Sequence, residues 1–259
     1  MNIAGNLEIE RVAKRFNGIA AVDDVSFAVR PGEVLGYIGP NGAGKSTTIK
    51  MIIGMLEPSD GRILYHGRSI IGDLPGFQRR LGYVPEEPNL YPFLSGREYL
   101  QLAGRLRGLD GDALNCKIER FFGLFSLWED RDCPVSSYSK GMRQKVLLSA
   151  ALLHDPEVLI LDEPLSGLDV NAILAVRELL KRLAANGKTI LYSSHVLDVM
   201  EKVCSRVVIL RRGRVVADDS IERLRERTDQ PSLEVVFSQI TKESGKTNLA
   251  DGIVEAMQL

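Results

Sequence analysis

The sequence is poor in cysteine: only three cysteines occur among 259 residues, and they stand far apart without a Cys-x-x-Cys pair. This scarcity favours a reduced, cytosolic protein. No run of about 18 apolar residues is present, so we expect no segment that spans a bilayer. The first residues also lack the cationic start and apolar block that are typical of a signal peptide.

Charge of one sign is not in excess either, since 33 basic and 34 acidic residues leave a net charge of -1. No global field would draw the chain to nucleic acid or to an anionic membrane surface, and we expect no nucleic-acid partner. Hydrophobic residues make up 44% of the chain and charged residues 26%, close to the averages of globular proteins. A folded chain with a sizeable core is therefore expected.

Short apolar runs alternate with amphipathic stretches, which is typical of an α/β fold. We expect a strand at 33–38 and a helix that starts near Lys45 and is stopped by Pro58, because apolar residues recur between them every three or four positions. The further expected elements are strands at 158–161, 189–192 and 206–210, a helix at about 173–183 closed by Asn186-Gly187, and a hairpin turn at 211–214.

The middle of the chain differs, because residues from about 89 to 155 are mostly helical and read as an insertion in the α/β core. Ser95 and Glu98 fit a capping box in front of a helix at 99–109. Beyond residue 220 we expect a short helix at 221–225 and a strand at 233–237, whereas the last twenty residues give little signal.

One stretch carries a specific chemical signature, G-x-x-x-x-G-K-[ST]. It reads Gly39-Pro40-Asn41-Gly42-Ala43-Gly44-Lys45-Ser46, with Thr47 after it. Glycines let backbone N–H groups surround phosphate oxygens, and the helix that follows adds its positive dipole end. Lys45 would supply a cation for the β- and γ-phosphates, and Ser46 a hydroxyl ligand for Mg²⁺. The alternative is a glycine-rich turn with an incidental lysine; the strand before the motif and the helix after it favour the nucleotide site.

Two adjacent acids, Asp162 and Glu163, end the apolar run at 158–161. The carboxyl end of a buried parallel strand is where α/β sheets bind ligands. Asp162 is placed to hold Mg²⁺, directly or through water, and Glu163 to act as the general base for water that attacks the γ-phosphate. Two ordinary surface acids are the alternative, which the upstream phosphate loop makes less favourable.

Together these motifs resemble the ATP-binding cassette (ABC) ATPase family over residues 7–220. The segment Tyr138-Ser139-Lys140-Gly141-Met142-Arg143-Gln144 resembles the family's signature motif, Ser166-Gly167-Leu168-Asp169 resembles its D-loop, and His195 its switch histidine. The resemblance implies a P-loop NTPase (RecA-like) core with a mostly parallel sheet, an antiparallel β edge and an inserted α-helical subdomain. The ABC ATPase domain would be 1–220, with the core at about 1–88 and 156–220, the helical subdomain at about 89–155, and a C-terminal extension at 221–259.

In this family two cassettes pack head to tail and bury two ATP molecules between them. The resemblance therefore implies that Ser139 and Gly141 contact the γ-phosphate held by a partner chain, and that Asp169 belongs to the same nucleotide site. His195 would hydrogen-bond the γ-phosphate and orient the attacking water. Phe16 would stack on adenine, or else be a core phenylalanine near an edge strand. Because one cassette is present, we expect an ATP-induced homodimer or heterodimer.

Two departures from the family pattern stand out. Glu86 occupies the position of the usual Q-loop glutamine, and its carboxylate would still ligate Mg²⁺. In the signature, Lys140 replaces the first glycine and Met142 the usual glutamine. This pattern looks like that of the subgroup that pairs with ABC-2 type exporter permeases.

The leading hypothesis is thus the ATP-hydrolysing subunit of an ABC transporter, with ATP and Mg²⁺ as cofactors and an integral membrane permease as a separate chain. It would be cytoplasmic and peripheral on the inner face of the cell membrane. The apolar residues of 87–99 would form a groove for a short permease helix, or the core of the helical insertion, or both. The alternatives are a soluble single-cassette assembly ATPase and a regulatory cassette with poor turnover; Glu163 and His195 argue against the latter. His66 and His154 are expected to be structural.

Overall fold

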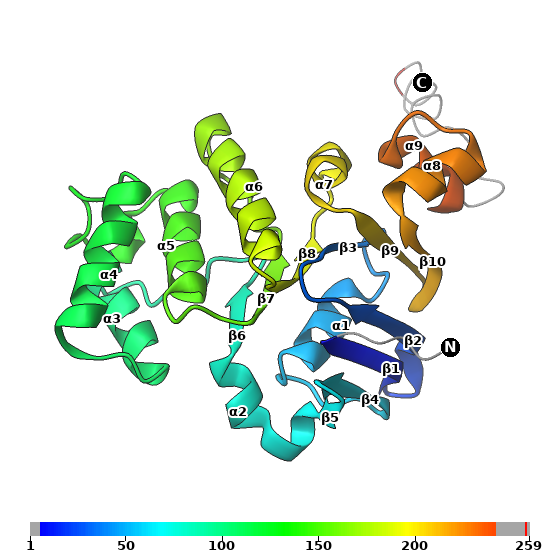
Figure 1. Cartoon of the computed structure of the whole chain (residues 1–259), viewed down its shortest axis with the longest axis horizontal. Helices are drawn as coiled ribbons and strands as arrows, with labels where there is room; N and C mark the ends of the chain where they lie inside the picture. The colour runs from blue at the N-terminus through cyan, green and yellow to red at the C-terminus, as the bar shows by residue number, and fades with distance from the viewer. Residues whose placement is uncertain (1–5, 242–256, 258–259) are drawn as a thin grey trace.

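The computed structural model describes residues 6–241 and Met257, and its centre is a six-stranded sheet (Figure 1). The strand order is β10-β9-β3-β8-β7-β6. The strands are β3 (Val34–Ile38), β6 (Leu81–Val84), β7 (Val158–Asp162), β8 (Thr189–Ser193), β9 (Arg206–Arg211) and β10 (Arg214–Ser220). All neighbours pair in parallel except β10, which runs antiparallel to β9. The strands expected at 33–38, 158–161, 189–192 and 206–210 and the hairpin turn at 211–214 are therefore confirmed.

Side chains of the central strands alternate between two hydrophobic cores, as the twofold period of a strand requires. In β3, Leu35 and Tyr37 face the first core, whereas Val34 and Ile38 face the second. Every residue of β3, β7 and β8 is buried. Helices or strands must therefore cover both faces of this sheet, which explains the continuous apolar runs in the sequence.

The first core is covered by α1 (Lys45–Ile52) and by a four-stranded antiparallel sheet in the order β2-β1-β4-β5. Its strands are β1 (Leu7–Phe16), β2 (Ile19–Val29), β4 (Asp60–Tyr65) and β5 (Arg68–Ser69), followed by the 3-10 helix η1 (Ile70–Asp73) and α2 (Leu74–Arg79). This second sheet is the antiparallel β region that the family resemblance implies.

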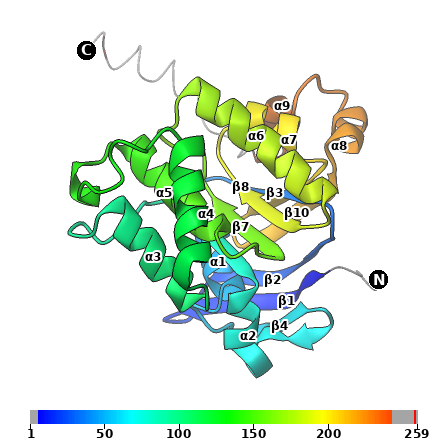
Figure 2. The ribbon, with the colours of Figure 1, turned by 60° about the vertical axis from the view of Figure 1, so that its left-hand side comes forward.

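The second core lies under α6 (Val170–Ala185), α7 (Leu197–Val203), α8 (Ile221–Thr228) and α9 (Leu233–Thr241). Between β6 and β7 the chain leaves the sheet and forms the helical subdomain at one end of the molecule, seen in Figure 1 and from the side in Figure 2. It consists of α3 (Gly96–Leu106), α4 (Gly111–Leu124), the 3-10 helix η2 (Val135–Ser137) and α5 (Lys140–Leu152).

The predicted capping box starts this subdomain. Ser95 Oγ accepts from the Glu98 N–H at 3.2 Å, and Glu98 Oε2 accepts from the Ser95 N–H at 2.8 Å.

Within the described residues, no helix has both the length and the apolar character needed to cross a bilayer.

The expected strand at 233–237 is wrong, because these residues begin helix α9. Its β-branched composition favoured a strand, but Leu233, Val236 and Ile240 recur with helical spacing and pack into the second core. Glu201 of α7 accepts a hydrogen bond from the Leu233 N–H at 3.1 Å, which satisfies a donor in the first turn of the helix.

The expected end of the first helix is also wrong, because α1 stops at Ile52, well before Pro58. Gly54 has a φ of +77°, and a Cβ there would lie 2.4 Å from Leu74 Cδ1. A left-handed glycine, packed against Leu74 of α2, follows directly after the helix and its cap.

Candidate nucleotide site

The phosphate loop connects β3 to α1, and its glycines are required by close backbone contacts. A Cβ at Gly39 would lie 2.5 Å from the Leu210 carbonyl oxygen, and one at Gly44 would lie 2.6 Å from the Ala21 carbonyl oxygen. Gly42 and Gly44 also have φ values of +76° and +103°, in the left-handed region that glycine adopts without strain. Local conformation and packing therefore both require glycine in this loop.

The loop ends at the N-terminus of α1, which has neither a side-chain cap nor an acidic residue in its first turn. The unpaired N–H groups and the positive dipole end of such a terminus attract an anion. Lys45 lies beside them, and its Nζ donates to the carbonyl oxygens of Gly39 (2.5 Å) and Pro40 (3.3 Å). Burial lowers the pKa of Lys45, while the carboxylates of Asp162, Glu163 and Glu86 raise it.

Residues from distant parts of the sequence meet around this loop and line a cavity of about 360 Å³. The lining residues are Ala21, Asn41, Gly42, Ala43, Gly44, Lys45, Ser46, Thr47, Glu86, Asp162, Glu163 and His195. Gly39 and Pro40 do not line it, although their carbonyl oxygens hold Lys45. The place of Ala21 in this cavity could not be predicted from the sequence, because its backbone carbonyl, and not its side chain, approaches Gly44.

Glu163 is the best-anchored acid in the cavity, with 8% of its surface exposed. Its Oε1 lies 2.8 Å from His195 Nδ1, and its Oε2 accepts from Ser194 Oγ at 3.0 Å. The Glu163 N–H donates to the Ser193 carbonyl oxygen at 2.9 Å. The His195 side chain remains 78% exposed, so the pair consists of a buried carboxylate and an imidazole that solvent reaches. Ser194, not singled out in the sequence, stands immediately before His195.

Asp162 ends β7 and is buried beside Lys45. Burial raises its pKa to about 6; the nearby carboxylates of Glu86 and Glu163 also raise it, whereas the neighbouring Ser193 side chain and the charge of Lys45 lower it. The raised pKa means that the protein surroundings stabilise the negative charge of Asp162 less well than water does. A bound divalent cation would stabilise this charge.

The donor set of the cavity fits Mg²⁺. Asp162, Glu86 and the Ser46 hydroxyl offer the hard oxygen ligands that this cation prefers. Among the residues that the structure describes, no three His, Cys, Asp or Glu side chains converge into a ready-made metal site.

The other predicted nucleotide residues do not line this cavity. Ser139 caps α5, its Oγ accepting from the Met142 N–H at 3.2 Å, and Asp169 caps α6, its Oδ1 accepting from the Ala172 N–H at 2.9 Å. A Cβ at Gly141 would lie 2.5 Å from the Gly167 carbonyl oxygen, so signature and D-loop touch. Phe16 is 47% exposed at the end of β1, and Lys14 Nζ lies 5.6 Å from the centre of its ring.

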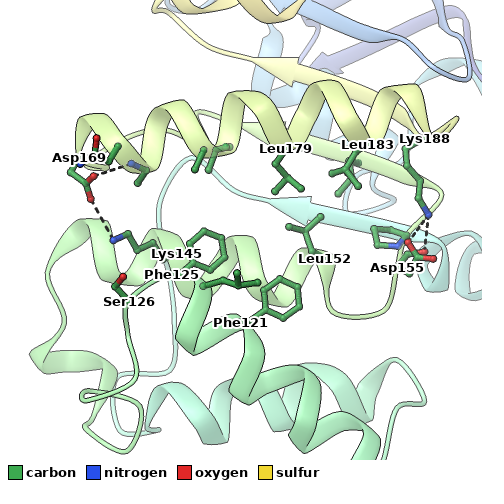
Figure 3. Close-up of a pocket in the computed structure, with 17 residues that line it drawn as sticks. Phe121, Phe125, Ser126, Lys145, Leu152, Asp155, Asp169, Leu179, Leu183 and Lys188 are labelled. Carbon is green, nitrogen blue, oxygen red and sulfur yellow. Dashed lines mark hydrogen bonds and ion pairs between the residues drawn. The ribbon is translucent and has the colours of Figure 1, made fainter.

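A larger cavity, of about 700 Å³, lies between α4, α5 and α6 (Figure 3). Its centre is apolar, with Phe121, Phe125, Leu152 and Leu179 pointing into it, and of the predicted site residues only Asp169 lines it. Since this cavity lacks the phosphate loop and the acids of β7, it is not the nucleotide site. His154, expected to be structural, lies elsewhere and is held by the Leu81 carbonyl oxygen at 3.1 Å from Nε2.

Together the parallel sheet, the phosphate loop at its carboxyl edge and the inserted helical subdomain define a P-loop ATPase with the architecture of an ATP-binding cassette. The sequence profile of a family described as ABC transporter matches residues 22–166, more than half of the chain. The chain therefore belongs to the ABC transporter family.

Relatives at higher identity agree with this assignment. The uncharacterized ABC transporter ATP-binding protein YhcH of Bacillus subtilis (strain 168) is 42% identical over 212 residues, which cover 81% of this chain and 68% of that protein. The ABC transporter ATP-binding protein NatA of the same organism is 36% identical over 220 residues, covering 85% of this chain and 89% of NatA.

Solved structures are similar as well. A structure described as the ATP binding subunit of an ABC transporter superposes with a TM-score of 0.85 at 36% identity, covering 91% of this chain and 99% of that one. A dimeric cassette, MJ0796 in a post-hydrolysis state with ADP and Pi, has the same fold, with a TM-score of 0.76 at 23% identity and coverage of 83% and 98%. The predicted family and fold are confirmed. The chain is an ATP-hydrolysing subunit coupled to transport, and the assembly ATPase is not favoured.

Proposed function

We propose that this chain binds Mg²⁺-ATP in the phosphate-loop cavity, pairs with a second cassette and hydrolyses ATP to drive a separate integral membrane permease. The observation that carries the proposal is that one cavity holds the phosphate loop, the Asp162–Glu163 acids and His195. These groups arrive from three separate strand ends of one sheet, β3, β7 and β8, and form a phosphate cradle with an anchored base.

Each residue has a role that its position supports. The N–H groups of 41–47 and the Lys45 ammonium would hold the β- and γ-phosphates. Ser46, Glu86 and Asp162 would ligate Mg²⁺, which neutralises phosphate charge when it is bound. Glu163 would accept a proton from the attacking water, while His195, 2.8 Å from its carboxylate, orients that water towards the γ-phosphate. Phe16, exposed at the end of β1, would stack on adenine.

A second cassette is part of the proposal, because the signature lies apart from the phosphate loop of its own chain. Ser139 and Gly141 do not line the phosphate-loop cavity, yet they stand at the exposed start of helix α5. In a head-to-tail pair this helix start would face the γ-phosphate of the partner. The partner would be a second copy or a related cassette.

Export is the proposed direction of transport. The Nod factor export ATP-binding protein I of Ralstonia nicotianae is 37% identical over 211 residues, which cover 82% of this chain and 66% of that protein. The signature segment with Lys140 also resembles that of the subgroup that pairs with ABC-2 type exporter permeases. The chain would work at the inner face of the cell membrane, held there by its permease.

The segment after Glu86 supports contact with that permease. Phe93 is 92% exposed and Tyr91 is also exposed, whereas Leu90 packs against two of the hydrophobic cores. The two alternatives for 87–99 thus apply to different residues: Leu90 belongs to a core, and Tyr91 with Phe93 would meet a permease helix.

A purified preparation tests the proposal. We expect Mg²⁺-dependent ATP hydrolysis whose rate per chain rises with protein concentration, because each site needs residues of two chains. Sizing chromatography with Mg²⁺-ATP should detect the pair when Glu163→Gln slows hydrolysis. Full hydrolysis by isolated single chains would overturn the two-chain site, and a chain that binds no ATP would overturn the whole proposal.

A further inference from the structure

Three neighbouring residues on one face of α5 touch the loop that carries the proposed base. They are Gly141, Gln144 and Lys145, at helical spacings of three and four that bring side chains together. The loop runs from Glu163 at the end of β7 to Asp169 at the start of α6. The signature helix and the catalytic loop of the same chain are thus fastened to each other.

Gln144 makes the central contact. Its side chain is 0% exposed, and Nε2 donates to the Pro164 carbonyl oxygen at 3.0 Å. Its Oε1 has no hydrogen-bond partner among the residues that the structure describes. A buried amide with one unpaired oxygen is costly for stability, so its presence needs another reason.

The carbonyl group that Gln144 binds belongs to Pro164, directly after Glu163, and the backbone of Glu163 is in an unusual conformation. Glu163 has a φ of +49°, in the left-handed region, and a proline follows it. A non-glycine residue there costs about 1–2 kcal/mol and persists only where its surroundings fix it. The fixing hydrogen bonds are Glu163 N–H to Ser193 O (2.9 Å), Ser166 N–H to Glu163 O (3.1 Å) and Gln144 Nε2 to Pro164 O (3.0 Å).

The contacts on either side of Gln144 keep helix and loop in register. A Cβ at Gly141 would meet the Gly167 carbonyl oxygen at 2.5 Å, so only glycine allows this approach. Figure 3 shows Lys145 reaching from α5 to Asp169, with Nζ 3.4 Å from Oδ2. Of the three contacts, only that of Gln144 ends next to the proposed base.

We propose that Gln144 is a positioning residue for hydrolysis: it links the signature helix to the Pro164–Leu165 peptide, directly after Glu163, and so fixes the direction of the Glu163 carboxylate. This inference rests on the proposed role of Glu163 as the base. When the start of α5 engages the partner's nucleotide, the same helix aligns the base for the nucleotide of its own chain. Gln144 does not line the phosphate-loop cavity and would act only through Glu163.

Gln144→Met tests this proposal, because methionine matches glutamine in length but has no N–H donor. We expect kcat to fall by about tenfold or more, since displacing a catalytic group by less than 1 Å has large effects on rate. The Kd for ATP, measured with Mg²⁺, should stay within about twofold, because the phosphate loop is untouched. An unchanged kcat in a folded Gln144→Met protein would overturn the proposal.

Ser149→Ala is the matched control. Ser149 is buried on the same helix, but its Oγ donates within α5, to the Lys145 carbonyl oxygen at 2.9 Å, and not to the loop at 163–169. We expect this variant to keep its kcat within about twofold. An equal loss of kcat in both variants would show that general loosening of α5 is responsible and would overturn the positioning role.

A double-mutant cycle separates positioning from simple destabilisation. In a Glu163→Gln background, Gln144→Met should change the residual rate by less than about twofold, because the group through which it acts is gone. If Gln144→Met lowers the rate by the same factor in the Glu163→Gln background as in the wild type, the proposal is overturned. If Gln144→Met does not fold, Gln144→Glu replaces it: its rate relative to the wild type should rise as the pH falls, because a protonated carboxyl donates to Pro164 O and a carboxylate does not. A constant ratio would count against it.

The failure of this inference differs from the failure of the proposed function. A wild-type chain that binds no ATP, or does not hydrolyse it as a pair, contradicts the proposed function. An active wild-type enzyme whose Gln144 variants keep full activity contradicts only the positioning role.

Discussion

Gly44→Ala should damage ATP binding far more than it damages the fold. The added Cβ would lie 2.6 Å from the Ala21 carbonyl oxygen, whereas ordinary contacts begin at 3.4 Å, so backbone must move by about 0.8 Å. The φ of +103° adds strain for any residue with a side chain. Because Gly44 is the N-cap of α1, the movement displaces N–H groups that would contact phosphate.

The loss of one charge-assisted hydrogen bond to phosphate is worth about 1.5–3 kcal/mol. Since 1.4 kcal/mol is a factor of ten, the Kd of Gly44→Ala for Mg²⁺-ATP should rise by about 10–100-fold in titration calorimetry. Gly67→Ala is the matched control, because Gly67 also has a positive φ of +72° but nothing within 4 Å of its Cβ position, and it lies outside the cavity. It should lose stability in a thermal unfolding assay yet keep its Kd. Wild-type affinity in Gly44→Ala would refute the phosphate cradle.

Three further outcomes are expected. Glu163→Gln should lower kcat by about 10²–10⁴-fold in a phosphate-release assay and leave the Kd for ATP nearly unchanged, because the base is lost and the cradle is kept; a weak effect would exclude Glu163 as the base. Removal of Mg²⁺ by a chelator should abolish hydrolysis and weaken ATP binding, because Asp162 and Glu86 would then face the phosphates without a cation; binding that stays equally tight would contradict the proposed ligands. Leu233→Ala should lower the free energy of unfolding in urea by about 2–5 kcal/mol, because Leu233 is fully buried under α7; a cost below about 0.5 kcal/mol, typical of surface sites, would contradict the packing of α9.

The phosphate loop could be predicted from the sequence because its geometry is encoded within eight consecutive residues. The meeting of Glu163 and His195 is different. They are far apart in the sequence and follow different strands, and only the resemblance to a family brought them together before the fold was known. Ala21 lay beyond either route, since its contribution is a backbone carbonyl from β2 that approaches Gly44.

Helix α9 shows the limit of local pattern reading. The run from Leu233 to Phe237 is rich in residues that favour strands, and over five residues the strand and helix periods are hard to tell apart. What decides is tertiary: Leu233 and Val236 find a core under α7, and Glu201 satisfies the first backbone donor of the helix. Glu201 also lies 3.1 Å from Arg225 of α8, so α7 holds both α8 and α9.

Through α7, helices α8 and α9 are linked to the loop that carries Ser194 and His195. Helix α7 begins at Leu197, directly after the His195 loop, and the Val196 N–H donates to Ser194 Oγ at 3.1 Å, the same hydroxyl that donates to Glu163. The proposed base, Glu163, therefore has support on two sides: Gln144 of the signature helix holds the carbonyl of the next residue, Pro164, and Ser194 holds the Glu163 carboxylate from the loop in front of α7. Because the first support comes from the helix proposed to face the partner, it would respond to nucleotide in the pair, whereas the second is built into the fold of the single chain.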